Sequence, residues 1–207
     1  MSIAIVDYGV GNLFSLSSSL NFLGLENIIT RDASALEKAD RVILPGVGAF
    51  GDAMDKLRAT GLVPTLDSFA KSGRPLMGIC LGMQLLFEES FEYGAHRGLG
   101  YIPGSVKPLA EAFEDKGISL KVPHMGWNSL DIRLPSCPAL RRSAQGDFVY
   151  FVHSFYAVCE KEYIAASSNY GVDVPAVVCR DNVCGCQFHP EKSGAVGLEI
   201  LRSFAEM

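Results

Sequence analysis

Short apolar runs alternate with segments of helical periodicity in the first part of the chain. Strands are predicted where apolar residues follow one another between polar or glycine-containing segments, at residues 3–7, 27–30, 41–44 and 76–79. Between the first two strands, a helix is predicted because leucines recur at helical spacing until Gly24, at Leu13, Leu16, Leu20 and Leu23. Strands that alternate with helices predict parallel pairing through right-handed crossovers.

The pattern changes after Phe87. Shorter helices around Leu36 and around Met54 precede this point, and glycines and prolines punctuate residues 94–117 beyond it. Strand-like pieces then follow at residues 119–122, 127–132, 148–152, 164–167, 176–179 and 183–188. Asp181 and Asn182 predict a hairpin turn, and residues 195–204 a final helix.

These elements predict an α/β fold of the flavodoxin-like kind. We expect a mixed sheet with flanking helices, and antiparallel strands in the C-terminal half. The chain has 207 residues and shows no repeat, low-complexity tract or convincing linker, so residues 1–207 are interpreted as a single domain.

The most informative chemical feature is a cysteine between two glycines, in the segment 78–82 of sequence GICLG. Apolar residues precede it and an amphipathic run follows, so Cys80 is predicted on a sharp strand-to-helix turn. A thiol at a helix N-terminus faces unpaired N–H groups and the positive end of the helix dipole, which favour the reactive thiolate. The amide of Leu81 would then be placed to donate to an oxyanion. The turn indicates acyl transfer.

A nucleophilic cysteine needs a base and a group that orients the base. His189 and Glu191 follow a β-like stretch, where residues two apart lie on the same face, and Pro190 stiffens the spacing. A carboxylate beside the imidazole favours its charged form, which stabilises a nearby thiolate. Taken singly, these residues are more often structural, but together they predict a Cys80, His189, Glu191 triad.

Composition and charge exclude several classes of partner and location. The net charge is −5 and no lysine or arginine cluster marks a phosphate-binding surface, so we expect no nucleic-acid partner. No apolar run approaches the roughly 20 residues that span a bilayer, and the chain enters a strand at once without a secretory leader. We therefore expect no membrane association and a cytoplasmic protein. Its six cysteines are expected to be reduced thiols.

Two other sites have to be weighed. Cys179, Cys184, Cys186 and His189 could supply zinc ligands, but two of the cysteines lack a zinc-knuckle loop, so we predict no metal. Residues 46–51 match the dinucleotide-binding pattern G-x-G-x-x-G, but in the third strand–helix unit and without the expected acidic residue, so we predict no cofactor. The same glycine-rich loop can instead offer a second backbone N–H to an oxyanion.

Five segments carry a resemblance to a known family: VILPGVGAF at 42–50, GICLGMQ at 78–84, PHMGWN at 123–128, YFVHS at 150–154 and FHPEKS at 188–193. The chain resembles the class I (triad) glutamine amidotransferases over nearly its whole length. The cysteine turn and the His-Pro-Glu segment are shared across that family, whereas HMGWN and EKS are similar to members that serve histidine biosynthesis.

The resemblance implies a mechanism and a substrate, L-glutamine. Cys80 would attack the glutamine side-chain amide, with the oxyanion held by the Leu81 amide and by the peptide between Val47 and Gly48. Substrate contacts are implied for Gly48, Gln84, His153, Ser154 and Phe155. Phe155 departs from the tyrosine common at its position, which leaves a hydroxyl contact there in doubt. Without the resemblance, Gln84 could equally be a solvent-facing helix residue.

The resemblance also implies a separate ammonia-consuming partner, because this chain has no second catalytic domain. The partner would be a (β/α)₈-barrel cyclase subunit in a heterodimer. The implied docking face includes Asn12, Pro123, Met125, Trp127 and Lys192, although Trp127 could equally be a core aromatic. Two alternatives stay open: a redox module that uses Cys80 as an oxidation sensor, and a glutaminase that feeds a different acceptor, such as a sugar amidation enzyme.

Overall fold

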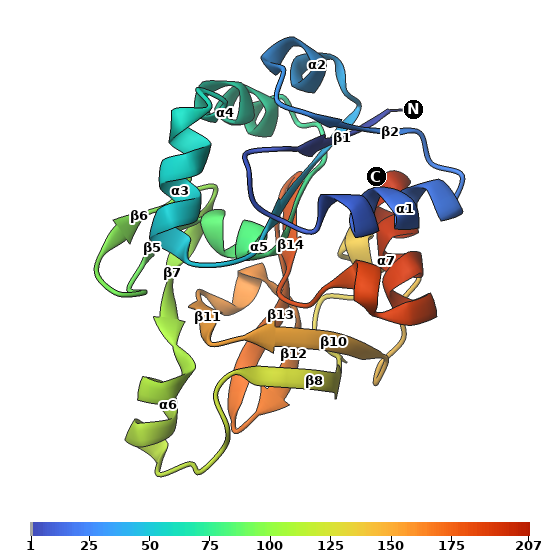
Figure 1. The fold of residues 1–207 in the computed structure, drawn as a ribbon. Helices are drawn as coiled ribbons and strands as arrows, with labels where there is room; N and C mark the ends of the chain where they lie inside the picture. Colours follow the sequence, from blue (N-terminus) through green and yellow to red (C-terminus); the bar gives the residue numbers. More distant parts are fainter. Residues whose placement is uncertain (1) are drawn as a thin grey trace.

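Eight strands form one central sheet in the computed structural model, which describes residues 2–207 (Figure 1). The sheet order is β2-β1-β3-β4-β14-β13-β12-β9. The strands are β1 Ile3–Val6, β2 Asn27–Thr30, β3 Arg41–Gly46, β4 Leu76–Cys80, β9 Asp131–Ile132, β12 Ile164–Tyr170, β13 Val172–Arg180 and β14 Val183–Cys186. The first five strands in this order pair in parallel and the last three pair antiparallel, which confirms the predicted mixed sheet.

Helices cover both faces of the sheet. One face packs against α1 (Leu13–Phe22) and α7 (Gly194–Ala205), and the other against α2 (Ala33–Lys38), α3 (Phe50–Ala59), α4 (Val63–Lys71) and α5 (Leu81–Leu85) (Figure 1). Strand β1 shows why: Ile3 and Ile5 belong to the core under α1 and α7, while Ala4 and Val6 belong to the opposite core. The period of two in a strand sends successive side chains to opposite faces.

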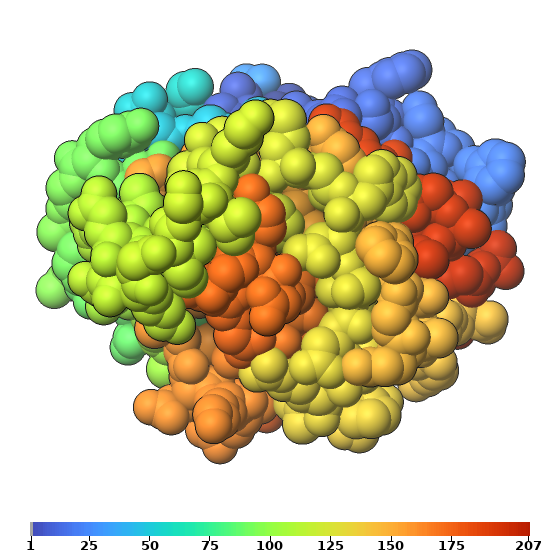
Figure 2. All heavy atoms as spheres, turned by 90° about the horizontal axis from the view of Figure 1, so that it is seen from below, coloured from blue at the N-terminus to red at the C-terminus, as the bar shows by residue number. Residues whose placement is uncertain are grey.

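Smaller elements extend the C-terminal half. A four-stranded sheet has the order β11-β7-β5-β6, and a two-stranded sheet pairs β10 with β8. Their bounds are β5 Phe87–Ser90, β6 His96–Arg97, β7 Ile102–Pro108, α6 Leu109–Lys116, β8 His124–Ser129, β10 Phe148–His153 and β11 Phe155–Val158, with 3₁₀ helices η1 Pro138–Leu140, η2 Lys161–Tyr163 and η3 Pro190–Lys192. Seen from below, green-yellow to orange segments of this half make up most of the surface (Figure 2).

The structure matches most of the predicted elements of the first half. Each of its four strands begins at the predicted residue, and Gly24 has the left-handed φ of 71° expected after a helix. The prediction of a strand at 119–122 is wrong, since no strand forms there, and the strand predicted at 127–132 begins earlier, at His124, and is interrupted at Leu130. The run after Cys80 is not amphipathic, because every residue of α5 is buried. Helices α4 and α6 were not predicted.

Strand order brings the chemical residues together. β4 lies between β3 and β14, and all three run parallel, so their carboxyl ends meet at one edge of the sheet. Gly46 pairs with Cys80 at that edge, and the chain leaving β14 reaches His189 three residues later. Ligands of open α/β sheets bind at this edge. No helix among residues 2–207 is long and apolar enough to span a membrane.

Candidate active site

Cys80 occupies a strained turn between β4 and α5. Its φ of 54° and ψ of −111° lie where residues with side chains are seldom found. The flanking glycines let strand and helix approach: a side chain at Gly82 would overlap the carbonyl oxygen of Leu44, and one at Gly78 would lie 2.6 Å from the oxygen of Gly82. The turn therefore depends on both glycines, and it presents the sulfur to the cavity described below.

His189 and Glu191 form a buried pair beside this turn. The imidazole Nδ1 lies 2.8 Å from Glu191 Oε1, with the two side chains only 4% and 3% exposed. The backbone holds the ring in place, because His189 N donates to the carbonyl of Tyr150 at 3.0 Å and Ser193 Oγ donates to the His189 carbonyl at 2.6 Å. Burial lowers the pKa of His189, but hydrogen bonds to Cys80 and Glu191 outweigh it and raise the pKa to about 9. The ring is therefore an imidazolium at neutral pH.

The sulfur of Cys80 has a second neighbour. Gln187 is fully buried, and its Nε2 donates to Cys80 Sγ at 3.8 Å. This amide is thus a hydrogen-bond donor to the sulfur from the residue directly after β14. The sequence showed no signal for this role, since a single glutamine before the His-Pro-Glu segment has no characteristic spacing.

A second, much smaller void borders the His189–Glu191 pair. Oε2 of Glu191 is buried and has no hydrogen-bond partner among residues 2–207. A void of about 10 Å³ lies there, and Asn12 and Val47 line it together with both members of the pair. Asn12, which was predicted at a docking face, therefore lies directly behind the candidate base.

A cavity of about 440 Å³ opens over Cys80. Its walls include every residue predicted to contact substrate, together with the candidate nucleophile and base; these are Val47, Gly48, Cys80, Leu81, Gln84, His153, Ser154, Phe155 and His189. The reading of Gln84 as a solvent-facing residue is wrong, because it is 4% exposed. Two residues predicted at a partner interface, Pro123 and Lys192, also line the cavity.

Glu92 and Tyr93 line the same cavity and were missed from the sequence. Glu92 is 8% exposed, and its Oε2 accepts from the backbone N–H of Phe50 at 2.6 Å. Burial raises the pKa of this carboxyl, while the hydrogen bond from Phe50 opposes the shift. No sequence signal distinguishes these residues, because they follow β5 in an irregular segment that only the tertiary fold brings to the cavity.

The two sides of the predicted oxyanion site differ in their packing. Leu81 is the first residue of α5, so its N–H has no helical acceptor one turn earlier. Gly48 has a φ of 96° and open space around its Cα, and Val47 beside it is 42% exposed. Among residues 2–207 no acceptor is found for the Gly48 amide. Both amides border the cavity, one in a packed turn and one in an open loop.

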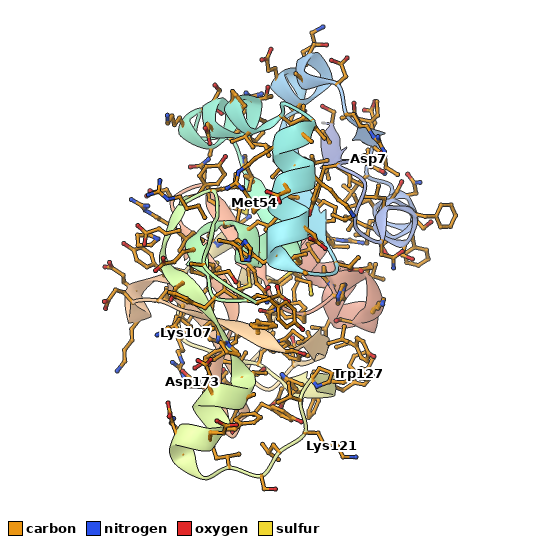
Figure 3. The ribbon with its side chains drawn as sticks, turned by 60° about the vertical axis from the view of Figure 1, so that its left-hand side comes forward. Asp7, Met54, Lys107, Lys121, Trp127 and Asp173 are labelled. Atoms are coloured by element: carbon orange, nitrogen blue, oxygen red, sulfur yellow. The ribbon has the colours of Figure 1, made fainter. Side chains whose placement is uncertain are left out.

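Met125 and Trp127 lie outside the cavity on β8. They are 60% and 54% exposed, so the interpretation of Trp127 as a core aromatic is wrong. The indole meets Tyr150 edge-on at 6.1 Å between ring centroids. Figure 3 shows Trp127 in the lower half of the molecule, away from Asp7. Within the described part of the chain, no three His, Cys, Asp or Glu side chains are grouped as metal ligands.

The chain is similar to known proteins over nearly its full length. Residues 4–207 match the family model described as glutamine amidotransferase class-I. The chain is 49% identical over 205 residues to the imidazole glycerol phosphate synthase subunit HisH of Listeria monocytogenes serovar 1/2a, covering 99% of this chain and 95% of that protein. It is 50% identical over 206 residues to the HisH subunit of Geobacter metallireducens, covering 99% and 97%.

Solved structures with low sequence identity share the fold. A crystal structure of a glutamine amidotransferase matches with a TM-score of 0.74 at 20% identity, covering 98% of each chain. The structure of PurLQS from Thermotoga maritima matches with a TM-score of 0.73 at 19% identity, covering 99% of this chain and 97% of that chain.

Proposed function

This chain belongs to the class-I glutamine amidotransferase family, and we propose that it is the glutaminase subunit of an imidazole glycerol phosphate synthase. It hydrolyses L-glutamine to L-glutamate and ammonia and delivers the ammonia to a cyclase subunit in histidine biosynthesis. The observation that carries the proposal is that Cys80 and His189 line one cavity and Glu191 holds His189 from behind, in a chain about half identical to HisH subunits over nearly its full length.

The first half-reaction forms a thioester. The Cys80 thiolate attacks the side-chain amide carbon of glutamine, making a C–S bond and an oxyanion. The Leu81 amide and the peptide between Val47 and Gly48 stabilise this oxyanion. As the intermediate collapses, His189 Nε2–H gives its proton to the leaving nitrogen, the C–N bond breaks and ammonia departs. Glu191 on Nδ1 holds the ring in position for this transfer.

The second half-reaction hydrolyses the thioester. His189, now neutral, takes a proton from water as the water oxygen attacks the carbonyl carbon. The second oxyanion is held by the same amides, the C–S bond breaks, and glutamate leaves with the thiolate restored. Gln187 supports that thiolate through its contact with Sγ.

Recognition of glutamine uses the cavity wall. The Glu92 carboxylate is the acidic group best placed to receive the α-ammonium, and its backbone bond to Phe50 fixes its orientation. Gln84 donates both amide hydrogens into the protein, to Phe155 O and Gln187 Oε1 at 3.0 Å each, so its Oε1 is left to accept from substrate. Phe155 stands where tyrosine is common, but its contact with Gln84 is made by the backbone carbonyl, so that contact does not need a side-chain hydroxyl.

The partner is a cyclase subunit with a (β/α)₈ barrel, and the pair is a heterodimer. Met125 and Trp127 supply exposed apolar surface beside the cavity, while Pro123 and Lys192 form part of its rim, so docking over this face would enclose the ammonia. Residues 1–207 act as one domain, and the six free cysteines suit a cytoplasmic location.

Cys80→Ser and Cys80→Ala in the purified heterodimer test the proposal. Glutamine-dependent product formation should fall by at least about 10⁴-fold, because the nucleophile is lost. Saturating ammonium salt should restore product, since only the ammonia source is missing. Cys159→Ser, a half-buried cysteine away from the cavity, should behave as wild type. Glutamine-dependent turnover that survives in Cys80→Ala, or a complex that assembles but is not rescued by ammonium, would refute the two-site design.

A further inference from the structure

A line of side-chain hydrogen bonds crosses from strand β8 to the cavity, behind the residues that carry the chemistry. Asn128 Nδ2 lies 3.3 Å from His124 Nε2, and His124 Nδ1 lies 3.0 Å from His153 Nε2. His153 Nδ1 in turn lies 2.8 Å from the carbonyl oxygen of Phe155. His124 and His153 face each other across the antiparallel β8–β10 pair.

The chemistry of the two ends allows only one arrangement of protons. A carbonyl oxygen only accepts, so His153 must carry its proton on Nδ1, and its Nε2 must accept. His124 therefore donates from Nδ1 and accepts on Nε2 from the Asn128 amide. The amide is itself fixed in this orientation, because its Oδ1 accepts from Ser129 N at 2.8 Å and its Nδ2 also donates to Asn169 O at 2.9 Å.

Both rings stay neutral, as this arrangement requires. Burial lowers the pKa of His124 to about 4 and that of His153 to about 3, the latter with help from the neighbouring histidines. His124 is also clamped between two rings, stacked on Phe151 at 4.6 Å and on Tyr170 at 4.0 Å between centroids. We call the series of hydrogen bonds from Asn128 through His124 and His153 to the Phe155 carbonyl the relay. Its rings thus have a defined position, and its hydrogen bonds have a defined direction.

At the cavity the relay meets the wall of the glutamine site. The carbonyl of Phe155 accepts from both His153 and Gln84. The other amide hydrogen of Gln84 goes to Gln187 Oε1, and Gln187 Nε2 goes to the sulfur of Cys80. A shift of the Phe155 carbonyl would therefore move Gln84, a residue of the cavity wall.

We propose that His124 is a positioning residue for the glutamine site: by holding His153 in its Nδ1-protonated form, it fixes the Phe155 carbonyl and, through it, Gln84. This inference rests on the proposed glutaminase function and assigns a role to a buried residue that contacts neither substrate nor the triad. His124 acts mainly on substrate binding, because the Phe155 carbonyl and Gln84 lie at the cavity wall, whereas three further hydrogen bonds separate that carbonyl from the sulfur of Cys80.

Two substitutions at this position separate hydrogen bonding from packing. His124→Phe keeps a ring between Phe151 and Tyr170 but removes both hydrogen bonds. His124→Asn loses the stacking but keeps a side-chain N–H near the place of Nδ1. The matched control is Tyr170→Phe, which keeps the stacked ring and loses only the hydroxyl that donates to Lys121 O at 3.0 Å.

Steady-state kinetics of the heterodimer provide the test. His124→Phe should raise the KM for glutamine about tenfold, the cost of one unpaired buried acceptor, with kcat changed less than about threefold. His124→Asn and Tyr170→Phe should stay within about threefold of the wild-type KM. Ammonium-dependent product formation should be unchanged in all three. A KM for His124→Phe equal to that of wild type, or one for His124→Asn that is just as high as that of His124→Phe, would overturn the proposal, because the hydrogen bond to His153 would then not decide the KM.

Nitrogen NMR of the wild-type chain tests the relay without any assay. The chain has four histidines, so the ring signals can be assigned one by one. His124 and His153 should each show a protonated Nδ1 and a bare Nε2 at neutral pH. A proton on Nε2 of either ring would refute the relay even if the enzyme is a glutaminase. The predicted tautomers in a chain that hydrolyses no glutamine would uphold the relay and reject the function.

Discussion

Two glycine-flanked loops lie side by side at the carboxyl edge of the sheet, and they are built in opposite ways. The turn at Cys80 is packed so closely that Gly82 has no room for a side chain beside Leu44. The loop at Gly48, one strand away, has open space around it and an exposed neighbour in Val47. One proposed oxyanion donor, the Leu81 amide, therefore lies in a closely packed turn, while the other, the Val47–Gly48 peptide, lies in a loop with room to rotate. The proposed nucleophile thus lies in the closely packed turn, and the proposed adjustable donor lies in the open loop.

The largest effect is expected from a substitution in the closely packed turn at Cys80. Gly82→Ala would push a methyl group into the carbonyl of Leu44, where neither backbone can yield. We expect a loss of more than about 3 kcal/mol in the free energy of unfolding, enough to prevent accumulation of folded chain. Soluble yield and thermal denaturation measure this directly. A stable Gly82→Ala protein with normal turnover would show that the turn is not packed as described.

The open loop at Gly48 predicts that glutamine hydrolysis is regulated by the partner. We expect the isolated chain to be a poor glutaminase, and docking together with a ligand in the partner's site to raise its kcat by roughly 10² to 10³, the value of one oxyanion donor. The measurement compares the chain alone, the heterodimer, and the heterodimer with an unreactive analogue of the partner's substrate. Equal kcat in the three conditions would mean that the Val47–Gly48 peptide is already in place.

The histidines of the site predict two opposite dependences of stability on pH. The folded pKa values of His124 and His153, about 4 and about 3, lie below the unfolded value near 6.5, so the unfolded chain binds more protons in acid. The contribution of these two groups to stability should be full above pH 6.5 and fall below it, by up to about 2.7 kcal/mol per pH unit. His189, at about 9, acts oppositely, and its contribution is present below pH 6.5 and lost as the pH rises through 9.

Urea denaturation at half-unit steps from pH 5 to 9 would measure both changes: the loss of stability below pH 6.5 and the loss as the pH rises toward 9. His124→Asn should reduce the acid slope by about half, because one of the two lowered groups is gone. If the free energy of unfolding of that variant fell just as steeply below pH 6.5 as that of wild type, the acid dependence would belong to other groups.

The smallest effect is expected from Gly48→Ala. An alanine at a φ of 96° is strained but meets nothing, so stability should fall by only about 1 to 2 kcal/mol. Gly24→Ala, at a φ of 71° with equally open space and far from the cavity, is the matched control. The two should lose similar stability, but only Gly48→Ala should lower activated glutamine turnover. Equal turnover in both variants would mean that the conformation of Gly48 does not matter to the reaction.

The first four strands could be predicted from the sequence because their signals are local, although helix α4 between β3 and β4 was missed. Each strand there is a continuous apolar run followed by a helix, and β1 to β4 begin where the pattern places them. Cys80 and His189 could be proposed for a related reason, since each is surrounded by residues that shape its own turn. Their pairing could be foreseen from the chemistry that joins them, and the 2.8 Å contact of His189 with Glu191 follows from their spacing.

The other half could not be foreseen in the same detail. Residues 119–122 have the apolar alternation of a strand but find no partner strand, while α6 lies in a stretch punctuated by glycine and proline. Glu92 and Gln187 become part of the site only through contacts made across the fold, 42 residues from Phe50 and 107 residues from Cys80. Such contacts leave no periodic trace in the sequence.

Strand β8 carries a constraint on how this chain can diverge. His124 and Asn128 point inward to the relay, and Met125 and Trp127 point outward to solvent. Because side chains alternate along a strand, a slip by one residue against β10 would exchange the two sets. Insertions before β8 are therefore expected to be absorbed entirely in the irregular segment 118–123, and lineages can vary the length of that segment freely while the pairing of β8 with β10 stays in one frame.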